Sequence, residues 1–249
     1  MENSTQSNNI TIIIPARYAS TRLEGKPLLE ANGKTIIQWV YEKAKQSKLA
    51  TDVIVATDDK RIFDKVESFG GKVCMTSTEH KCGSDRLVEV LKKHEDISIA
   101  VNVQGDEPMI EPDSIDSAIK LLIDDQNADM ATLIREINNE EEIQNPNTVK
   151  AVKDNNGYAM YFSRSPIPYE RNKNQASTFA HIGLYVYRRE TLLKMSELPQ
   201  SDLEKAESLE QLRALQNGFK IKTATVDYKP VGIDTREDFE EFLKMVNNN

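Results

Sequence analysis

Three cations follow the first apolar run of this sequence, and their charge and position suit the binding of a polyphosphate. Ile12–Ile14 is a β-branched run bounded by Pro15, which predicts a strand buried on both faces of a parallel sheet. Arg17, Arg22 and Lys26 come next, in a segment that has no apolar pattern. A loop after the first strand of an open α/β sheet commonly binds ligands, and clustered cations there suit phosphate groups. A solvated basic loop is the alternative interpretation.

The cationic segment matches neither of the two common phosphate-binding motifs. It lacks the G-x-x-x-x-G-K-[ST] pattern of the P-loop and the G-x-G-x-x-G pattern of dinucleotide-binding domains. Side-chain charge would therefore have to hold phosphate together with backbone amides. The missing glycine-rich turn also argues against a nicotinamide-binding Rossmann domain.

A carboxylate follows a later buried run. Residues Ile97–Val103 predict a strand, and Gln104, Gly105 and Asp106 come directly after it. An acidic residue at the carboxyl end of a strand, beside a glycine that lets a ligand approach, suits a hard cation that bridges phosphates. A structural carboxylate in a turn is the alternative.

The elements that would position these groups begin as a βαβαβ pattern. Apolar spacing predicts a helix from Ile36 to Ala44, a strand at 52–57, a helix at 60–69 and a strand at 72–75. Asp58 and Asp59 can cap the second helix, and Gly70 and Gly71 end it. This order predicts a parallel, doubly wound α/β sheet.

The rest of the chain predicts strands and helices in a mixed order. We expect a helix at 112–122, a strand at 129–134, a polar crossing at 140–147, a hairpin of 149–153 and 158–162, a strand at 181–188, a helix at 202–216, a strand at 219–226 and a final helix ending near Val246. Alternation within 181–188 puts His181, Gly183, Tyr185 and Tyr187 on one face.

Composition excludes several classes of function. The chain of 249 residues has a net charge of −8 and a pI near 5.1, which argues against general nucleic-acid binding. No apolar run approaches the ~20 residues that span a bilayer, so we expect a soluble, cytoplasmic protein, with residues 1–9 as a disordered tail. Cys74 and Cys82 fit free thiols in a reducing compartment, and with His80 they do not have the spacing of a zinc site.

Five motifs, in order, resemble those of the CMP-sugar synthetases, most closely the 3-deoxy-manno-octulosonate cytidylyltransferase family. The first is P-A-R-Y-A-S-T-R-L-E-G-K-P, and the others are Q-G-D-E-P, F-S-R-S-P-I-P, H-I-G-L-Y-V-Y-R and V-G-I-D-T-R-E-D. The family run S-G-T-E-R is replaced here by Cys82-Gly83-Ser84-Asp85-Arg86. The resemblance extends from Ile12 to Phe242.

The resemblance implies a Rossmann-like nucleotide-diphospho-sugar transferase fold, with a mixed, mostly parallel sheet flanked by helices. Residues 10–249 would form a single cytidylyltransferase domain, with about 149–216 as a lobe for sugar binding and dimerisation. The protein would be a homodimer.

The resemblance also implies roles for individual residues. CTP would be bound by Ala16, Arg17, Arg22, Lys26, Thr76, Ser77 and Ser84. The sugar acid would be bound by Arg86, Gln104, Arg164, His181, Tyr185, Glu210 and Gln211. Asp106 and Asp234 would bind Mg²⁺, and Lys26, Arg17, Asp106 and Asp234 would be catalytic. Local alternatives are a helix N-cap before Arg86 with Asp85 favouring the helix dipole, capping of the last helix by Asp234 or Thr235, a surface ion pair at Arg164, and a core or dimer face for Leu209, Leu212 and Leu215.

The implied activity is transfer of CMP from CTP to the anomeric hydroxyl of 3-deoxy-manno-octulosonate (Kdo), with release of pyrophosphate, for lipopolysaccharide or capsule synthesis. Substitutions around Cys82 and at Glu204–Ser208 leave transfer to the 8-amino analogue of Kdo, or to a sialic acid, as an alternative. A catalytically silent nucleotide-binding or regulatory protein is the alternative from a different class.

Overall fold

The computed structural model describes residues 9–19, 23–80, 82–172 and 175–247. The chain forms two compact units: one runs to Pro112 and resumes at Gly232, and the other is Asp113–Val231. Arg22 and residues 1–8 of the predicted tail lie outside the described residues. Asn9, the last residue of that predicted tail, is held in place, because its carbonyl accepts a hydrogen bond from the Ser98 amide at 3.0 Å.

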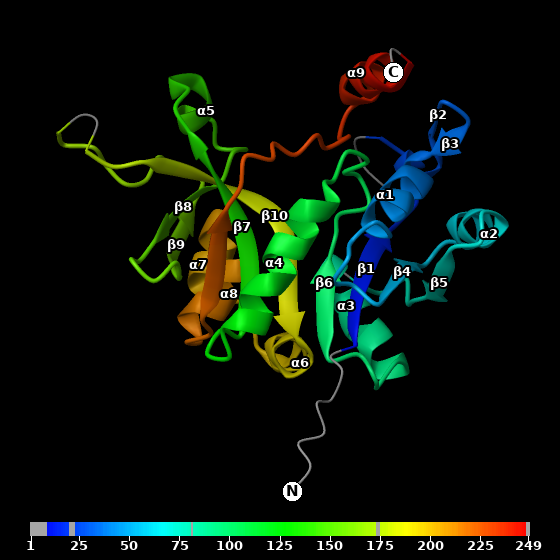
Figure 1. The fold of residues 1–249 in the computed structure, drawn as a ribbon, viewed down its shortest axis with the longest axis horizontal. Helices are drawn as coiled ribbons and strands as arrows, with labels where there is room; N and C mark the ends of the chain where they lie inside the picture. Colours follow the sequence, from blue (N-terminus) through cyan, green and yellow to red (C-terminus); the bar gives the residue numbers. More distant parts are fainter. Residues whose placement is uncertain (1–8, 20–22, 81, 173–174, 248–249) are drawn as a thin grey trace, which may run out of the picture. The chain divides into compact units, whose positions relative to one another are not determined.

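The first unit contains a parallel sheet in the order β6-β1-β4-β5 (Figure 1). Its strands are β1 (Ile10–Ala16), β4 (Asp52–Thr57), β5 (Lys72–Met75) and β6 (Ile99–Asn102). The three isoleucines Ile12–Ile14 are 0% exposed, as expected for a strand covered on both faces. The predicted βαβαβ arrangement is confirmed.

The helices of the first unit are α1 (Ile36–Ala44), α2 (Lys60–Ser68), α3 (Gly83–Lys93) and α9 (Arg236–Asn247). Asp59 caps α2 by accepting a hydrogen bond from the Arg61 amide, and Gly70 follows the helix with a φ of +77°. A 3₁₀ turn, η1 (Lys26–Leu28), and a small hairpin of β2 (Glu30–Ala31) and β3 (Lys34–Thr35) precede α1. The hairpin is too short to show a periodicity and was not predicted.

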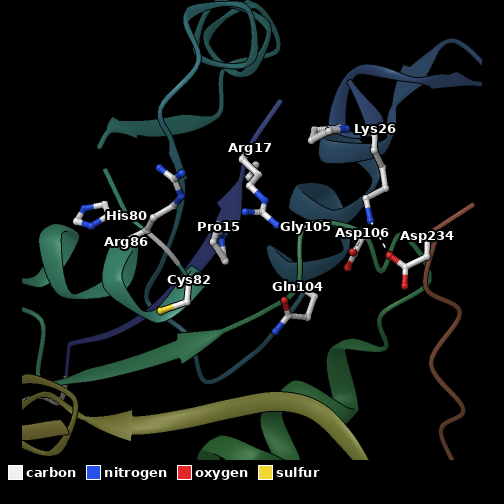
Figure 2. Close-up of a pocket in the computed structure, with 13 residues that line it drawn as sticks. Pro15, Arg17, Lys26, His80, Cys82, Arg86, Gln104, Gly105, Asp106 and Asp234 are labelled. Atoms are coloured by element: carbon white, nitrogen blue, oxygen red, sulfur yellow. Dashed lines mark hydrogen bonds and ion pairs between the residues drawn. The ribbon is translucent and has the colours of Figure 1, made fainter. Parts of the chain in front are cut away.

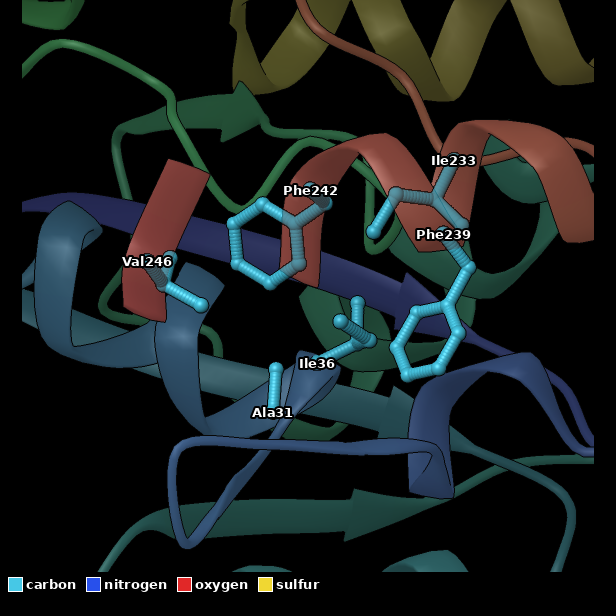
Figure 3. Packing of buried hydrophobic residues seen from close by; sticks show 6 residues of the cluster. All are labelled: Ala31, Ile36, Ile233, Phe239, Phe242 and Val246. Carbon is cyan, nitrogen blue, oxygen red and sulfur yellow. The ribbon is translucent and has the colours of Figure 1, made fainter. Parts of the chain in front are cut away.

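An apolar cluster fixes α9 against the hairpin and α1 (Figure 3). Phe239, Phe242 and Val246 of α9 pack with Ala31 and Ile36, and all five are less than 9% exposed. Because α9 begins two residues after Asp234, this packing also anchors the turn that carries Asp234.

The second unit has a mixed sheet in the order β11-β7-β10-β8-β9, in which β11 and β7 are parallel and β7–β10, β10–β8 and β8–β9 are antiparallel. Its strands are β7 (Met130–Ile137), β8 (Lys150–Lys153), β9 (Ala159–Ser163), β10 (Thr178–Arg188) and β11 (Ile221–Thr225). Its helices are α4 (Pro112–Asp124), α5 (Glu140–Gln144), α6 (Arg189–Glu197), α7 (Asp202–Glu207) and α8 (Gln211–Gln216). The predicted β8–β9 hairpin is confirmed, and α5 occupies the predicted polar crossing.

The prediction of one helix from 202 to 216 is wrong. Ser208 ends α7 in a left-handed conformation with a φ of 52°. The Arg164 guanidinium donates to the carbonyls of Glu207, at 2.7 Å, and of Ser208, at 3.4 Å, which satisfies the end of α7. The two short helices remain joined by a buried ion pair, in which Arg213 Nη2 lies 2.8 Å from Glu204 Oε1.

The α/β fold with a mixed, mostly parallel sheet flanked by helices is confirmed. Within the described ranges, no helix is both long enough and apolar enough to cross a bilayer.

Candidate active site

A pocket of about 280 Å³ opens at the carboxyl ends of β1 and β6 in the first unit (Figure 2). It brings together seven of the predicted site residues. These are Ala16, Arg17, Lys26, Arg86, Gln104, Asp106 and Asp234, and the pocket is completed by Pro15, Pro27, His80, Cys82, Gly83 and Gly105. Segments far apart in the sequence therefore meet where a parallel sheet commonly binds ligands.

Lys26 joins the two predicted metal-binding carboxylates. Its Nζ donates to Asp106 Oδ2 at 2.6 Å and to Asp234 Oδ1 at 3.1 Å (Figure 2). The Lys26 side chain is 12% exposed, against 32% for Asp106 and 46% for Asp234. One ammonium thus partly balances two carboxylates at the mouth of the pocket.

The local backbone before Lys26 directs its side chain into the pocket. Gly25 has a φ of +66°, and a Cβ there would lie 3.0 Å from the Tyr18 ring. The Gly25 amide also donates to the Tyr18 carbonyl at 3.0 Å. Only glycine readily fits this left-handed turn against an aromatic ring, and Pro27 then fixes the first turn of η1.

Gly105 explains how Asp106 comes so close to β1. A Cβ at Gly105 would lie 2.7 Å from the Pro15 carbonyl oxygen, closer than a real Cβ tolerates. The Asp106 carbonyl in turn accepts a hydrogen bond from the Ile233 amide at 2.9 Å. This bond ties the Asp106 turn to the segment that carries Asp234.

Asp234 itself sits at the start of α9. Asp238 Oδ2 accepts from the amides of Asp234, at 2.9 Å, and Thr235, at 2.8 Å, while the Asp238 amide donates to Thr235 Oγ1. This is a reciprocal cap, so the capping interpretation of Thr235 is confirmed. The cap fixes the backbone of Asp234 beside the pocket.

The carboxylates of Asp106 and Asp234 could hold a hard divalent cation. Both lie within 3.1 Å of one nitrogen atom, so their oxygens are close enough to share one ion. The described part of the chain assembles no group of three or more His, Cys, Asp or Glu side chains for a metal. Two carboxylates suit Mg²⁺, which usually keeps several waters and takes further oxygens from phosphates.

Arg86 lies at the other end of the pocket and is held by protein groups. Its guanidinium donates to Asp58 Oδ2 at 2.5 Å, to Thr76 Oγ1 at 2.8 Å and to the Ser77 carbonyl at 3.1 Å. Arg86 is 4% exposed. Its geometry therefore favours holding the loop after β5, and contact with a substrate stays a prediction.

Three predicted CTP residues do not line the pocket: Thr76, Ser77 and Ser84. The Thr76 hydroxyl accepts from Arg86, the Ser77 hydroxyl accepts from the Glu79 amide at 3.1 Å, and Ser84 Oγ lies 3.0 Å from Cys82 Sγ. Their hydroxyls are thus engaged within the loop and at the start of α3.

The sequence interpretation missed pocket residues that stand inside or just beside its own motifs. Pro15 and Pro27 bracket the cationic segment, and His80 comes shortly before Cys82. A signal for His80 was present, because a histidine sits in the same loop as residues assigned to CTP. From the sequence, His80 is weighed only together with Cys74 and Cys82, whose spacing argues against a zinc site.

In the second unit, His181 and Tyr185 lie on the same face of β10, as predicted, with ring centroids 5.2 Å apart. Thr132 Oγ1 is 3.0 Å from His181 Nε2, and also 2.8 Å from the Leu184 carbonyl and 3.0 Å from that of Ile182. Because carbonyls only accept, the hydroxyl proton points to them, and His181 Nε2 must donate to Thr132. Burial lowers the pKa of His181 to about 3, so the ring is neutral.

Glu210 and Gln211 begin α8. Burial and then the nearby charge of Glu210 raise the pKa of Tyr185 well above its ordinary value. Gln211 is 4% exposed, and its Nε2 has no hydrogen-bond partner among the described residues. A buried amide donor without a partner is costly, and a ligand oxygen would satisfy it.

Arg164 is engaged by backbone carbonyls. Besides its bonds at the end of α7, its Nη1 donates to the Pro146 carbonyl at 3.1 Å. The Lys150 ammonium, 0% exposed, donates to the carbonyls of Arg164, Thr148 and Asn145. Among the described residues, Arg164 therefore bonds to backbone carbonyls instead of forming the surface ion pair of the alternative interpretation. Contact of Arg164 with a sugar stays a prediction.

Comparisons with known proteins agree with the motifs. A family model described as cytidylyltransferase matches residues 11–221. The 3-deoxy-manno-octulosonate cytidylyltransferase of Fusobacterium nucleatum subsp. nucleatum is 48% identical over 237 residues, covering 95% of this chain and 96% of the relative. Its namesake from Geotalea uraniireducens is 49% identical over 246 residues, covering 94% and 98%.

A solved structure resembles this one over almost its whole length. It is that of CMP:2-keto-3-deoxy-manno-octonic acid synthetase complexed with CTP, with a TM-score of 0.93 and 45% identity, covering 97% of this chain and 99% of that chain. The chain therefore belongs to the cytidylyltransferase family and, within it, to the 3-deoxy-manno-octulosonate cytidylyltransferases.

Proposed function

We propose that this protein transfers CMP from CTP to the anomeric hydroxyl of Kdo, giving CMP-Kdo and pyrophosphate. The hydroxyl oxygen attacks the α-phosphorus, the bond from that phosphorus to the bridging oxygen breaks, and pyrophosphate leaves with the bonding electrons. The hydroxyl proton is released. Such a transfer depends mainly on positioning and on neutralising charge, so the chain need not supply a covalent nucleophile.

The observation that carries this proposal is the group formed by Lys26, Asp106 and Asp234, with Arg17 in the same pocket. Arg17 and Lys26 would bind phosphate oxygens and stabilise the leaving pyrophosphate. Arg22, from the same cationic segment, would add charge there. The pocket thus offers both cations for phosphates and carboxylates for a counter-ion.

Mg²⁺ would be held by Asp106 and Asp234 and, when bound, would polarise the α-phosphate and lower the pKa of the attacking hydroxyl. Gly105 contributes by allowing Asp106 to lie against β1, and the cap at Asp238 fixes the Asp234 turn. Gln104, from the same pocket, would contact the sugar acid.

We place the other sugar contacts on the second unit. The neutral His181, Tyr185, Glu210 and Gln211, whose Nε2 has no partner among the described residues, present donors and acceptors that suit a polyhydroxylated acid. Arg164, which follows β9 and donates to carbonyls at the end of α7, would also contact the sugar acid. Kdo is the proposed acceptor because the two relatives described above are named 3-deoxy-manno-octulosonate cytidylyltransferases.

The proposal extends to assembly and context. The lobe at about 149–216 would form a homodimer contact, and Met160 on β9, 63% exposed, and Tyr169, 89% exposed, supply apolar surface for it. Sedimentation velocity would then give a dimer, and Met160→Lys a monomer. The product would serve lipopolysaccharide or capsule synthesis in the cytoplasm.

Carboxylate variants test the catalytic assignment. Asp106→Asn and Asp234→Asn should abolish pyrophosphate release while leaving the thermal unfolding temperature within a few degrees of wild type. Asp64→Asn is the control, because Asp64 pairs with Lys60 on α2 away from the pocket. Turnover retained by Asp106→Asn would refute the role of Asp106, and identification of the product by mass spectrometry would check that CMP is the group transferred.

A further inference from the structure

The loop between β5 and α3 is held from one side by a carboxylate that has no role in the transfer described above. Glu89 of α3 accepts from the Ser77 amide at 2.8 Å and from His80 Nε2 at 2.6 Å, both through Oε2. Lys93 Nζ lies 2.7 Å from the other oxygen, Oε1. His80 and Glu89 are only 22% and 23% exposed, so this is a partly buried, ordered arrangement.

The hydrogen bonds define Nε2 as a nitrogen of the His80 ring that carries a proton. Partial burial alone would raise the pKa of Glu89, but the bonds from Lys93, the Ser77 amide and His80 lower it to about 2. Glu89 is therefore ionised and can only accept, so Nε2 of His80 carries a proton. In the neutral ring the other nitrogen, Nδ1, is then an acceptor.

The position of His80 in the pocket indicates which part of a nucleotide it meets. Figure 2 shows His80 with Arg86 and Cys82 at one end of the pocket and Lys26, Asp106 and Asp234 at the other. This step rests on the proposed function. A triphosphate bound at the Lys26 end would place the base and the ribose of the nucleotide at the His80 end. The guanidinium of Arg86, at the same end of the pocket, can only donate hydrogen bonds. An acceptor on His80 would therefore allow the pocket to bind a base through a donor group of that base.

We propose that His80 determines specificity for cytosine, with Nδ1 accepting a hydrogen bond from the exocyclic amino group, and that Glu89 is a positioning residue that fixes the ring for this contact. Uracil carries a carbonyl oxygen where cytosine carries the amino group. Two acceptors would then face each other, and the hydrogen bond would be lost. Loss of one such bond corresponds to about a tenfold preference for CTP over UTP.

Equilibrium binding tests this without a sugar acceptor. CTP and UTP are titrated, with Mg²⁺, into wild type, His80→Leu and the control Glu79→Gln, whose exposed side chain is on the same loop but outside the pocket. Wild type and Glu79→Gln should bind CTP about tenfold more tightly than UTP, and His80→Leu should bind the two alike. A preference unchanged in His80→Leu would overturn the proposal, and so would a wild type that binds both equally. A loss of affinity for both nucleotides in the same proportion would mean that His80 contacts phosphate, and would also overturn it.

Variants of Glu89 test the positioning role. Glu89→Leu releases the ring and should lose the preference for CTP, whereas Glu89→Gln keeps an oxygen for Ser77 and His80 and should restore it. The double variant of His80→Leu and Glu89→Leu should bind CTP as tightly as His80→Leu alone, because Glu89 acts through His80. A further loss of affinity for CTP in the double variant would contradict that role. Pyrophosphate release by wild type with CTP and Kdo is measured separately, so failure of the base contact is distinguishable from failure of the transfer reaction.

Discussion

Replacing Lys26 by methionine should make the nucleotide-free protein bind a divalent cation more tightly. In the structure a cation that binds both carboxylates has to displace the ammonium from Asp106 and from Asp234. Charged hydrogen bonds contribute about 1.5–3 kcal/mol each, and exposed ion pairs about 0.2–1 kcal/mol. Asp106 is 32% exposed and Asp234 46%, so low values apply to both. We take about 1.5 kcal/mol for the first contact and about 0.5 for the second, which together correspond to about 30-fold in affinity.

The assay is titration of Mn²⁺, with free Mn²⁺ measured by electron paramagnetic resonance in the absence of nucleotide. Lys26→Met should bind Mn²⁺ about 30-fold more tightly than wild type, and its turnover should be strongly reduced because a phosphate contact is lost. Lys60→Met is the control for net charge, since Lys60 pairs with Asp64 on α2. Equal Mn²⁺ affinity for Lys26→Met and Lys60→Met would refute the reasoning. CTP should raise the Mn²⁺ affinity of wild type more than that of Lys26→Met, because phosphate draws Lys26 away from the carboxylates.

Three further predictions concern the scaffold. Glu204→Leu leaves the charge of Arg213 without its buried partner, so the free energy of unfolding in urea should fall by about 3–5 kcal/mol. A double variant with Arg213→Met should recover much of this loss, and no recovery would contradict the pairing. Gly105→Ala places a Cβ 2.7 Å from a backbone oxygen, so it should raise the KM for CTP. The control Gly232→Ala should not, because no atom lies within 4 Å of its Cβ. An unchanged KM in Gly105→Ala would contradict the close approach. Burial lowers the pKa of His181 to about 3, below its ordinary 6.5, so its contribution to stability is complete above pH 6.5 and is lost as pH falls from there towards 3. The His181 ring signal, assigned by comparison with His181→Gln, should not titrate in NMR spectra between pH 8 and about 4. A titration midpoint near 6.5 would contradict the burial argument.

The parts of the site that lie at strand ends could be predicted from the sequence. Ile12–Ile14 has the continuous β-branched pattern that predicts a doubly covered strand, and the polar residues after such a strand are expected at the carboxyl edge of the sheet. The same argument put Asp106 at that edge after β6. A local signal for burial, followed by a local change to polar residues, was enough in both cases.

Features that depend on contacts between distant segments could not be read from the sequence. The helical pattern continues through Ser208, whereas in the structure the chain breaks there and the carbonyls of Glu207 and Ser208 accept hydrogen bonds from Arg164. Likewise, nothing near Arg86 in sequence indicates that Asp58 accepts its guanidinium. Such pairs form because folding brings the partners together, and a propensity or a motif carries no information about them.

The hydroxyl of Thr132 shows the same limit on strand β7. Alternation places His181 on one face of β10, but its tautomer follows from a hydroxyl on the neighbouring strand that also serves two carbonyls. The pairing register between β7 and β10 shifts between Ile182 and Tyr185, which brings those carbonyls within reach. A shift of this kind has no signature in the amino-acid pattern.

The most direct test of the account is pyrophosphate release by the purified protein with CTP, Mg²⁺ and one acceptor at a time: Kdo, its 8-amino analogue or a sialic acid, with UTP replacing CTP as the control. We expect release with CTP and Kdo, and much lower values of kcat/KM with the other two acceptors and with UTP. A higher kcat/KM for the 8-amino analogue would replace Kdo as the acceptor and keep the reaction. Tight binding of CTP without release from any acceptor would contradict the transfer reaction itself.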